Sequence, residues 1–153
     1  MGAQREISMK IAVGCDHGGF VLKNDVIRAI VDLGYEYVDF GCYDTNSVDY
    51  PDYAKKVAEA ILQGEAEKGV LLCGTGIGIS IAANKIDGIR CAHVTDNFSA
   101  QMSAEHNNAQ IIAMGGRITT GEDAYLFVKT FLTSKFQGGR HALRVEKIMA
   151  LEK

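Results

Sequence analysis

The chain has 153 residues and a formal net charge of −3, with 16 lysines and arginines against 19 aspartates and glutamates. Hydrophobic residues make up 47% of the chain, which is enough material for a full core and excludes a disordered protein. Because positive charge is not in excess, we expect no binding to nucleic acid or to an anionic membrane surface.

The first eight residues are interpreted as an extension outside the fold. They lack the apolar stretch of a signal peptide, and the chain has no apolar run of the roughly 20 residues that a transmembrane helix needs. The sequence therefore predicts a cytoplasmic location and one domain over residues 9–153, a usual size for a single domain.

Apolar runs rich in β-branched residues alternate with segments of helical periodicity along the chain. This alternation predicts a parallel sheet. Since the runs are apolar nearly throughout, most strands should be covered on both faces. The predicted strands are Lys10–Gly14, Tyr37–Phe40, Gly69–Cys73, Arg90–Val94 and Gln110–Met114.

An apolar stripe from Leu22 to Leu33 predicts the first helix, which Gly34 ends. The second helix has Pro51 near its start and Gly64 near its end. Further helices are predicted after the glycines that follow Cys73, over Asn97–Glu105, from the capping residues Thr119 and Thr120 to Lys135, and over His141–Leu151.

The last of these helices has no strand after it, so its apolar stripe lacks an obvious partner. The stripe either caps the sheet of its own chain or lies across a second subunit. The pattern leaves both alternatives open.

In open parallel sheets, ligands bind beyond the carboxyl ends of the strands. The third predicted strand ends there in CGTGIGIS, residues 73–80, whose glycines let several main-chain N–H groups converge on a small oxyanion. The motif is not the dinucleotide fingerprint, because position 79 is Ile, and it lacks the G-K-[ST] of a P-loop. The alternative is a purely structural turn between strand and helix.

Cys73 stands directly before these glycines, where a helix N-terminus favours a thiolate. Such a thiolate could abstract a proton from carbon. The alternative is a small buried hydrophobe, the role expected for Cys15, Cys42 and Cys91. No two cysteines form a CxxC pair, so neither a disulfide framework nor a zinc site is indicated.

His17 follows an aspartate at the exit of the first strand and is the better ligand candidate among the histidines. His93 lies in an apolar run and is predicted to be a hydrogen-bonded core histidine. His106, at the end of a helix, either neutralises the helix dipole or belongs to a site. Arg140 and Arg144 are i, i+4 neighbours that suit a phosphate, unless they form a solvated charged turn.

At these residues the sequence resembles the type B ribose 5-phosphate isomerases, a family that includes allose and galactose 6-phosphate isomerases. The resemblance runs from Met9 to about Leu151, through GCDHGGF, VDYPDYA, CGTGIGISIAANK, SAEHNNAQIIAMGGR and GGRHALRVEKI. It implies a three-layer α/β/α sandwich, Rossmann-like, around a five-stranded parallel sheet. It also implies a homodimer or a dimer of dimers with active sites at the subunit interface, and neither metal nor cofactor.

The implied reaction interconverts ribose 5-phosphate and ribulose 5-phosphate through a cis-enediolate. By resemblance, Cys73 is the base, Thr75 assists proton movement, and His106 opens the sugar ring with Asp16 as a polar partner. The residues assigned to the substrate are His17, Tyr50, Gly74, Gly76, Ile77, Gly78, Ser80, Asn107, Arg117, Arg140 and Arg144.

Several alternatives remain open at this level. Allose 6-phosphate and galactose 6-phosphate would use the same machinery, and the chain could be one subunit of a heteromeric galactose 6-phosphate isomerase. A receiver-like signalling module would need an aspartate at the end of the third strand, where this chain has Cys73. A small nucleotide-binding module is disfavoured by the missing fingerprints.

Overall fold

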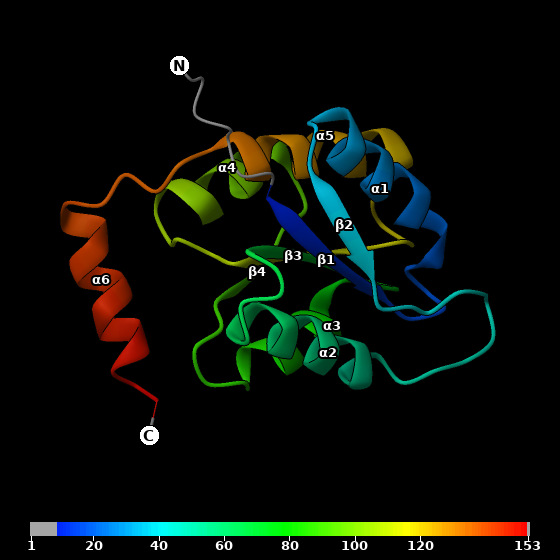
Figure 1. Ribbon diagram of the computed structural model, residues 1–153, viewed down its shortest axis with the longest axis horizontal. Coiled ribbons are helices and arrows are strands. Elements are labelled where there is room, and N and C mark those ends of the chain that lie inside the picture. Colours follow the sequence, from blue (N-terminus) through cyan, green and yellow to red (C-terminus); the bar gives the residue numbers. More distant parts are fainter. Residues whose placement is uncertain (1–8, 153) are drawn as a thin grey trace, which may run out of the picture.

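The structure is a computed structural model that describes residues 9–152, with a five-stranded parallel sheet at its centre (Figure 1). The predicted extension, residues 1–8, lies outside the described residues. The strands are β1 (Lys10–Cys15), β2 (Glu36–Asp39), β3 (Lys68–Cys73), β4 (Cys91–His93) and β5 (Ile111–Gly115), and their order across the sheet is β2-β1-β3-β5-β4.

Helices cover both faces of this sheet, which confirms the predicted sandwich (Figure 1). The helices are α1 (Lys23–Asp32), α2 (Tyr50–Leu62), α3 (Ile77–Asn84), α4 (Asn97–Glu105), α5 (Gly121–Thr133) and α6 (Arg140–Met149). A short 3-10 helix, Phe20–Leu22, precedes α1. Helices α1, α4 and α5 lie on one face, and α2 and α3 lie on the other.

Each face of the sheet has its own hydrophobic core. Ile30 of α1 and Phe131 of α5 are fully buried on one side, and Val57 of α2 and Ile79 of α3 on the other. Burying a side chain of this size contributes about 1.5 to 3 kcal/mol. Because β1, β3 and β5 lie between the two cores, their runs are apolar on both faces, as the sequence predicts.

The prediction for His93 was wrong. Its strand, β4, pairs with β5 alone and forms an edge of the sheet, so His93 is exposed rather than in the core. The order of strands decides which apolar run ends at an edge, and no local pattern in the sequence gives that order.

The helix boundaries follow the predicted signals. Pro51 stands in the first turn of α2, where its missing N–H is not needed. At the start of α5, Thr120 Oγ1 accepts the N–H of Asp123 at 3.1 Å, as a capping residue should. Gly34 follows α1 with a φ of +83°, a conformation that glycine adopts readily.

The sheet order creates a crevice. From β1 the chain moves outward to β2, at one edge of the sheet, whereas from β3 it moves in the opposite direction to β4, at the other edge. The connections that leave β1 and β3 therefore diverge and leave an opening beyond the carboxyl ends of these two neighbouring strands. Asp16 follows β1 there, and Gly74 follows β3.

Helix α6 is an arm that stands apart from the sandwich (Figure 1). None of its residues, all of which lie in the described part of the chain, is buried. Leu143, Ile148 and Leu151, on α6 and just after it, are exposed hydrophobic residues. Over residues 9–152, no helix combines the length and the apolar character required to span a membrane.

Candidate functional site

A pocket of about 360 Å³ opens between the carboxyl ends of β1 and β3. All of its lining residues except Gly18 are site residues that the sequence predicted. The lining residues are Asp16, His17, Gly18, Tyr50, Cys73, Gly74, Thr75, Ile77, Gly78 and Arg117.

The glycine-rich turn brings a main-chain donor to the thiol of Cys73. Gly76 has a φ of +83°, and a Cβ there would lie 2.8 Å from the backbone of Met114, so only glycine fits. In this conformation the Gly76 N–H donates to Cys73 Sγ at 3.1 Å. Helix α3 begins at the next residue, and the positive end of its dipole also favours negative charge here.

Ser80 does not line this pocket, although the sequence predicts that its amide contacts substrate. It is the fourth residue of α3, where the first internal hydrogen bond of a helix forms, and its N–H is directed at Gly76 O, 3.4 Å away. The Ser80 hydroxyl donates to Ile77 O at 2.8 Å. Both polar groups are therefore used within the helix.

Two cationic or hydrogen-bonding side chains face the pocket from other elements. The Val48 N–H donates to His17 Nδ1 at 3.2 Å, so the hydrogen of a neutral His17 ring is on Nε2. Arg117 follows β5, and a Cβ added to Gly74 would lie 3.4 Å from its Cζ, so the guanidinium lies against the glycine-rich turn. Asp16 is buried and accepts the Gly19 N–H at 3.0 Å. This arrangement suits an anion.

The loop between β2 and α2 leads to Tyr50 and is anchored by Lys23. The buried Lys23 Nζ donates to Cys42 O at 2.6 Å and pairs with Asp39 Oδ2 at 2.5 Å. At the end of this loop the ring of Tyr50 lies against Gly78, where an added Cβ would be 2.6 Å from Tyr50 Cζ. The close approach needs a residue without a side chain on α3.

Cys73 is itself buried, with 4% of its surface exposed, but it lines the pocket, whereas the other three cysteines do not. Cys15 and Cys42 are buried side by side, with their sulfur atoms 3.9 Å apart, as expected for small core residues, whereas Cys91 is only partly buried. Burial raises the pKa of Cys15 to about 12, with a further contribution from Cys42, and burial raises the pKa of Cys91 to about 12. These two thiols stay protonated at neutral pH.

Three of the remaining predicted residues, His106, Arg140 and Arg144, lie together away from this pocket. His106, at the end of α4, stacks on His141 of α6 with ring centroids 4.0 Å apart and an interplanar angle of 10°. The pKa of His141 is lowered by desolvation and, in decreasing order, by the positive charges of His106, Arg140 and Arg144. The sequence did not single out His141 as a site residue, although it stands between the two arginines. These four basic residues, of which Arg140 and Arg144 carry the permanent charges, form a group that we call the cationic cluster.

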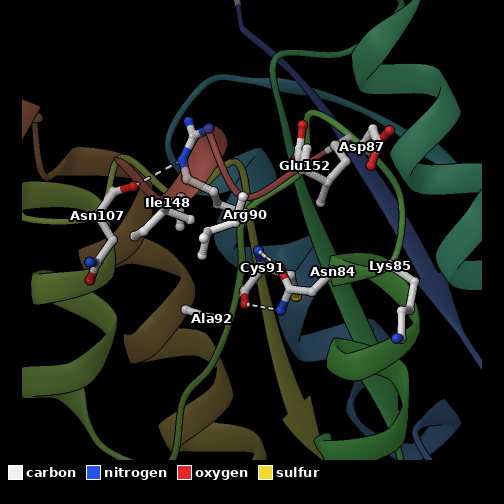
Figure 2. A pocket seen from close by; sticks show the side chains of 12 residues that line it. Asn84, Lys85, Asp87, Arg90, Cys91, Ala92, Asn107, Ile148 and Glu152 are labelled. Carbon is white, nitrogen blue, oxygen red and sulfur yellow. Dashed lines mark hydrogen bonds between the residues drawn. The ribbon is translucent and has the colours of Figure 1, made fainter. Parts of the chain in front are cut away.

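A larger hollow of about 760 Å³ lies between the end of α6 and the segment around β4 (Figure 2). Figure 2 shows Arg90 between Asn107 and Glu152, and Arg90 Nε donates to Asn107 O at 3.1 Å. Arg90 Nη1 also reaches Met149 Sδ at 3.2 Å, so Arg90 links the tip of α4 to α6. The predicted substrate ligand Asn107 thus lines this hollow and not the Cys73 pocket.

In one chain, therefore, the predicted site residues do not all converge on the Cys73 pocket. Within residues 9–152, neither the cationic cluster nor Asn107 lines the Cys73 pocket. No three His, Cys, Asp or Glu side chains in this part of the chain converge as a metal site would require.

Comparison with known proteins identifies this architecture. The family described as Ribose/Galactose Isomerase matches residues 11–148. Ribose-5-phosphate isomerase B of Escherichia coli (strain K12) is 46% identical over 143 residues, which cover 94% of this chain and 96% of that protein. The chain belongs to the ribose/galactose isomerase family.

Solved structures agree with this assignment. Clostridium thermocellum ribose-5-phosphate isomerase B superposes with a TM-score of 0.91 at 51% identity, covering 94% of this chain and 97% of that one. The Mycoplasma genitalium ribose-5-phosphate isomerase B, solved with bound ribulose-5-phosphate, has a TM-score of 0.89 at 34% identity, covering 96% and 98%. The chain is thus an isomerase, and the receiver-like and nucleotide-binding alternatives are not supported.

Proposed function

We propose that this protein interconverts ribose 5-phosphate and ribulose 5-phosphate, and that Cys73 moves the proton. The observation that carries the proposal is the sulfur of Cys73 in an open pocket, 3.1 Å from the Gly76 main-chain donor and beside His17 and Arg117. Membership of the ribose/galactose isomerase family supports the same reaction class.

In the proposed mechanism, the Cys73 thiolate takes the proton from C2 of the open-chain aldose. The electron pair moves to the carbonyl oxygen and forms a cis-enediolate, and the resulting thiol returns the proton to C1 to give the ketose. The Thr75 hydroxyl, which lines the same pocket, shifts the proton between the two substrate oxygens. No redox cofactor takes part in this exchange.

A proton next to a carbonyl is weakly acidic, so the enediolate itself must be stabilised. A positioned base contributes about 100- to 10,000-fold to the rate. Preorganised donors are worth roughly 3 to 4 kcal/mol each when removed. The N–H groups at the start of α3 are fixed in place by the turn and the helix, so they need no reorganisation as charge develops.

The phosphate is the remote group that fixes the substrate in the reactive geometry. We assign it to His17 and Arg117 of one protomer together with Arg140 and Arg144 of a second. The second protomer also supplies His106, to open the furanose ring with Asp16 as polar partner, and Asn107, to bind the sugar. A homodimer, or a dimer of such dimers, then has its active sites at the subunit interface.

The structure of one chain supports this sharing in three ways. The cationic cluster is separate from the Cys73 pocket, and α6 exposes apolar residues that a second copy can cover. The pKa of His141, which is lowered by desolvation and by its basic neighbours His106, Arg140 and Arg144, indicates a cluster that an anion would stabilise. The cytoplasmic location of the protein stays a prediction from the sequence. Its organisation as one domain also stays a prediction.

The substrate can be identified by comparing kcat/KM of the purified chain for ribose 5-phosphate, allose 6-phosphate and galactose 6-phosphate. We expect the highest value for ribose 5-phosphate. A higher value for either hexose phosphate would reassign the substrate within the family. Turnover by this chain alone would also argue against one subunit of a heteromeric enzyme, whereas no turnover of any of the three would contradict the proposal.

A second expected result concerns the contact between Tyr50 and Gly78. In Gly78→Ala the new methyl group displaces the Tyr50 ring, so KM for ribose 5-phosphate should rise about tenfold, equivalent to ~1.4 kcal/mol of lost binding. Alanine is otherwise favourable in a helix, so the melting temperature should not fall. Steady-state kinetics and thermal unfolding measure the two quantities.

The control is the same substitution in a Tyr50→Ala background. If the added methyl group acts through the Tyr50 ring, Gly78→Ala should cause no further loss there. Equal losses in both backgrounds would show that Gly78 acts independently of Tyr50.

A further inference from the structure

His93 contacts the glycine-rich turn from outside the pocket. Its Nε2 lies 2.9 Å from Thr75 O, and its ring lies against Gly76, where an added Cβ would be 2.8 Å from His93 Cδ2. A carbonyl oxygen only accepts hydrogen bonds, so the hydrogen of this ring is on Nε2. His93 is exposed and does not line the Cys73 pocket, so it does not touch substrate there.

The peptide unit that His93 holds is the one that faces the thiol. The Thr75 carbonyl and the Gly76 N–H belong to the same planar amide group. The carbonyl accepts from His93, and the N–H donates to Cys73 Sγ at 3.1 Å. Within residues 9–152, no other group donates to this carbonyl.

We infer that His93 is a positioning residue that sets the reactivity of Cys73 through the Thr75–Gly76 peptide. Its hydrogen bond fixes the plane of the amide, and consecutive hydrogen bonds polarise one another, so the Gly76 N–H becomes a better donor to a thiolate. The inference rests on the proposed role of Cys73 and adds a residue on β4 that the site residues do not include.

The test compares His93→Val with His93→Gln. Valine is β-branched, which suits a strand, and it removes the donor, whereas glutamine retains an N–H at a similar reach. The readout is the rate of Cys73 alkylation by iodoacetamide as a function of pH, with the Cys73 peptide quantified by mass spectrometry. Asp16, His17, Tyr50 and Arg117, the other titratable side chains that line the pocket, are the same in every variant.

In His93→Val, the alkylation rate of Cys73 at pH 7 should fall about 2- to 10-fold, the range that the loss of one hydrogen bond allows. The whole alkylation profile should move to higher pH, and kcat should fall by a similar factor with little change in KM. In His93→Gln, both the profile and kcat should recover. Thermal unfolding of both variants shows that each is folded.

An unchanged alkylation profile in folded His93→Val would overturn the inference, as would a loss that glutamine fails to restore. Alkylation needs no turnover, so this result is independent of the proposed reaction. If the profile shifts while kcat does not, the link from His93 to Cys73 is supported and the role of Cys73 as the base fails. If Cys73→Ala is inactive but the profile of His93→Val is unchanged, the proposed function stands and His93 has no part in it.

Discussion

Cys73→Ala is expected to reduce kcat for ribose 5-phosphate by about 100- to 10,000-fold, the contribution of a positioned acid–base group. Among the described residues, Cys73 provides the only sulfur that lines the pocket. Alanine has no atom that could accept the Gly76 N–H in place of Sγ or take the proton from the substrate. Alanine fills most of the same small space, so the sandwich should remain folded. The measurement is ribulose 5-phosphate formation at saturating substrate.

Two further readouts separate loss of chemistry from loss of structure. Binding of ribose 5-phosphate by calorimetry should persist, because the phosphate ligands are unchanged, while exchange of the C2 hydrogen with deuterated solvent should stop. The matched control is Cys91→Ala, which removes a partly buried thiol at the start of β4 and should turn over normally. Full turnover by Cys73→Ala would assign the base to another side chain.

Mixing two inactive variants is expected to restore activity if the sites are shared between protomers. The first variant is Cys73→Ala. The second carries Arg140→Ala and Arg144→Ala, which removes two charged phosphate ligands and should lower kcat/KM at least about 100-fold. After co-refolding in equal amounts, half of the dimers are mixed and each has one intact site, so about a quarter of the normal activity should return.

The control for this experiment pairs variants whose defects fall in the same pocket. Cys73→Ala mixed with Arg117→Ala leaves every site with one defect, because both residues line the pocket of one chain. No activity should return in that mixture. If the first mixture also stays inactive while sedimentation shows mixed dimers, the arginines act on their own chain.

The sequence predicts most of the central architecture because the signals there are local. Apolar runs on both faces mark β1, β3 and β5, and the rule that ligands bind at strand ends selects Asp16, His17 and Cys73 without any coordinates. Pro51 and Thr120 mark helix starts for reasons that involve only their own turn.

Features that depend on distant parts of the chain were not predicted. His93 was assigned to the core because its run is apolar, but the strand order makes β4 an edge. The stacking of His106 on His141 needs the approach of α6 to α4, which no spacing in the sequence reports.

The Cys73 pocket is built from parts of unequal rigidity. Cys73 ends β3, the middle strand of the sheet, whose neighbours on both sides are almost completely buried. Tyr50, in contrast, follows an outlying loop that is held by Lys23, by main-chain hydrogen bonds to Cys15 and by the bond from the Val48 N–H to His17. Exchanging that outlying segment would alter the depth available to a sugar and leave the reaction centre untouched, so one chemistry could be adapted to carbohydrates of different length by remodelling the periphery alone.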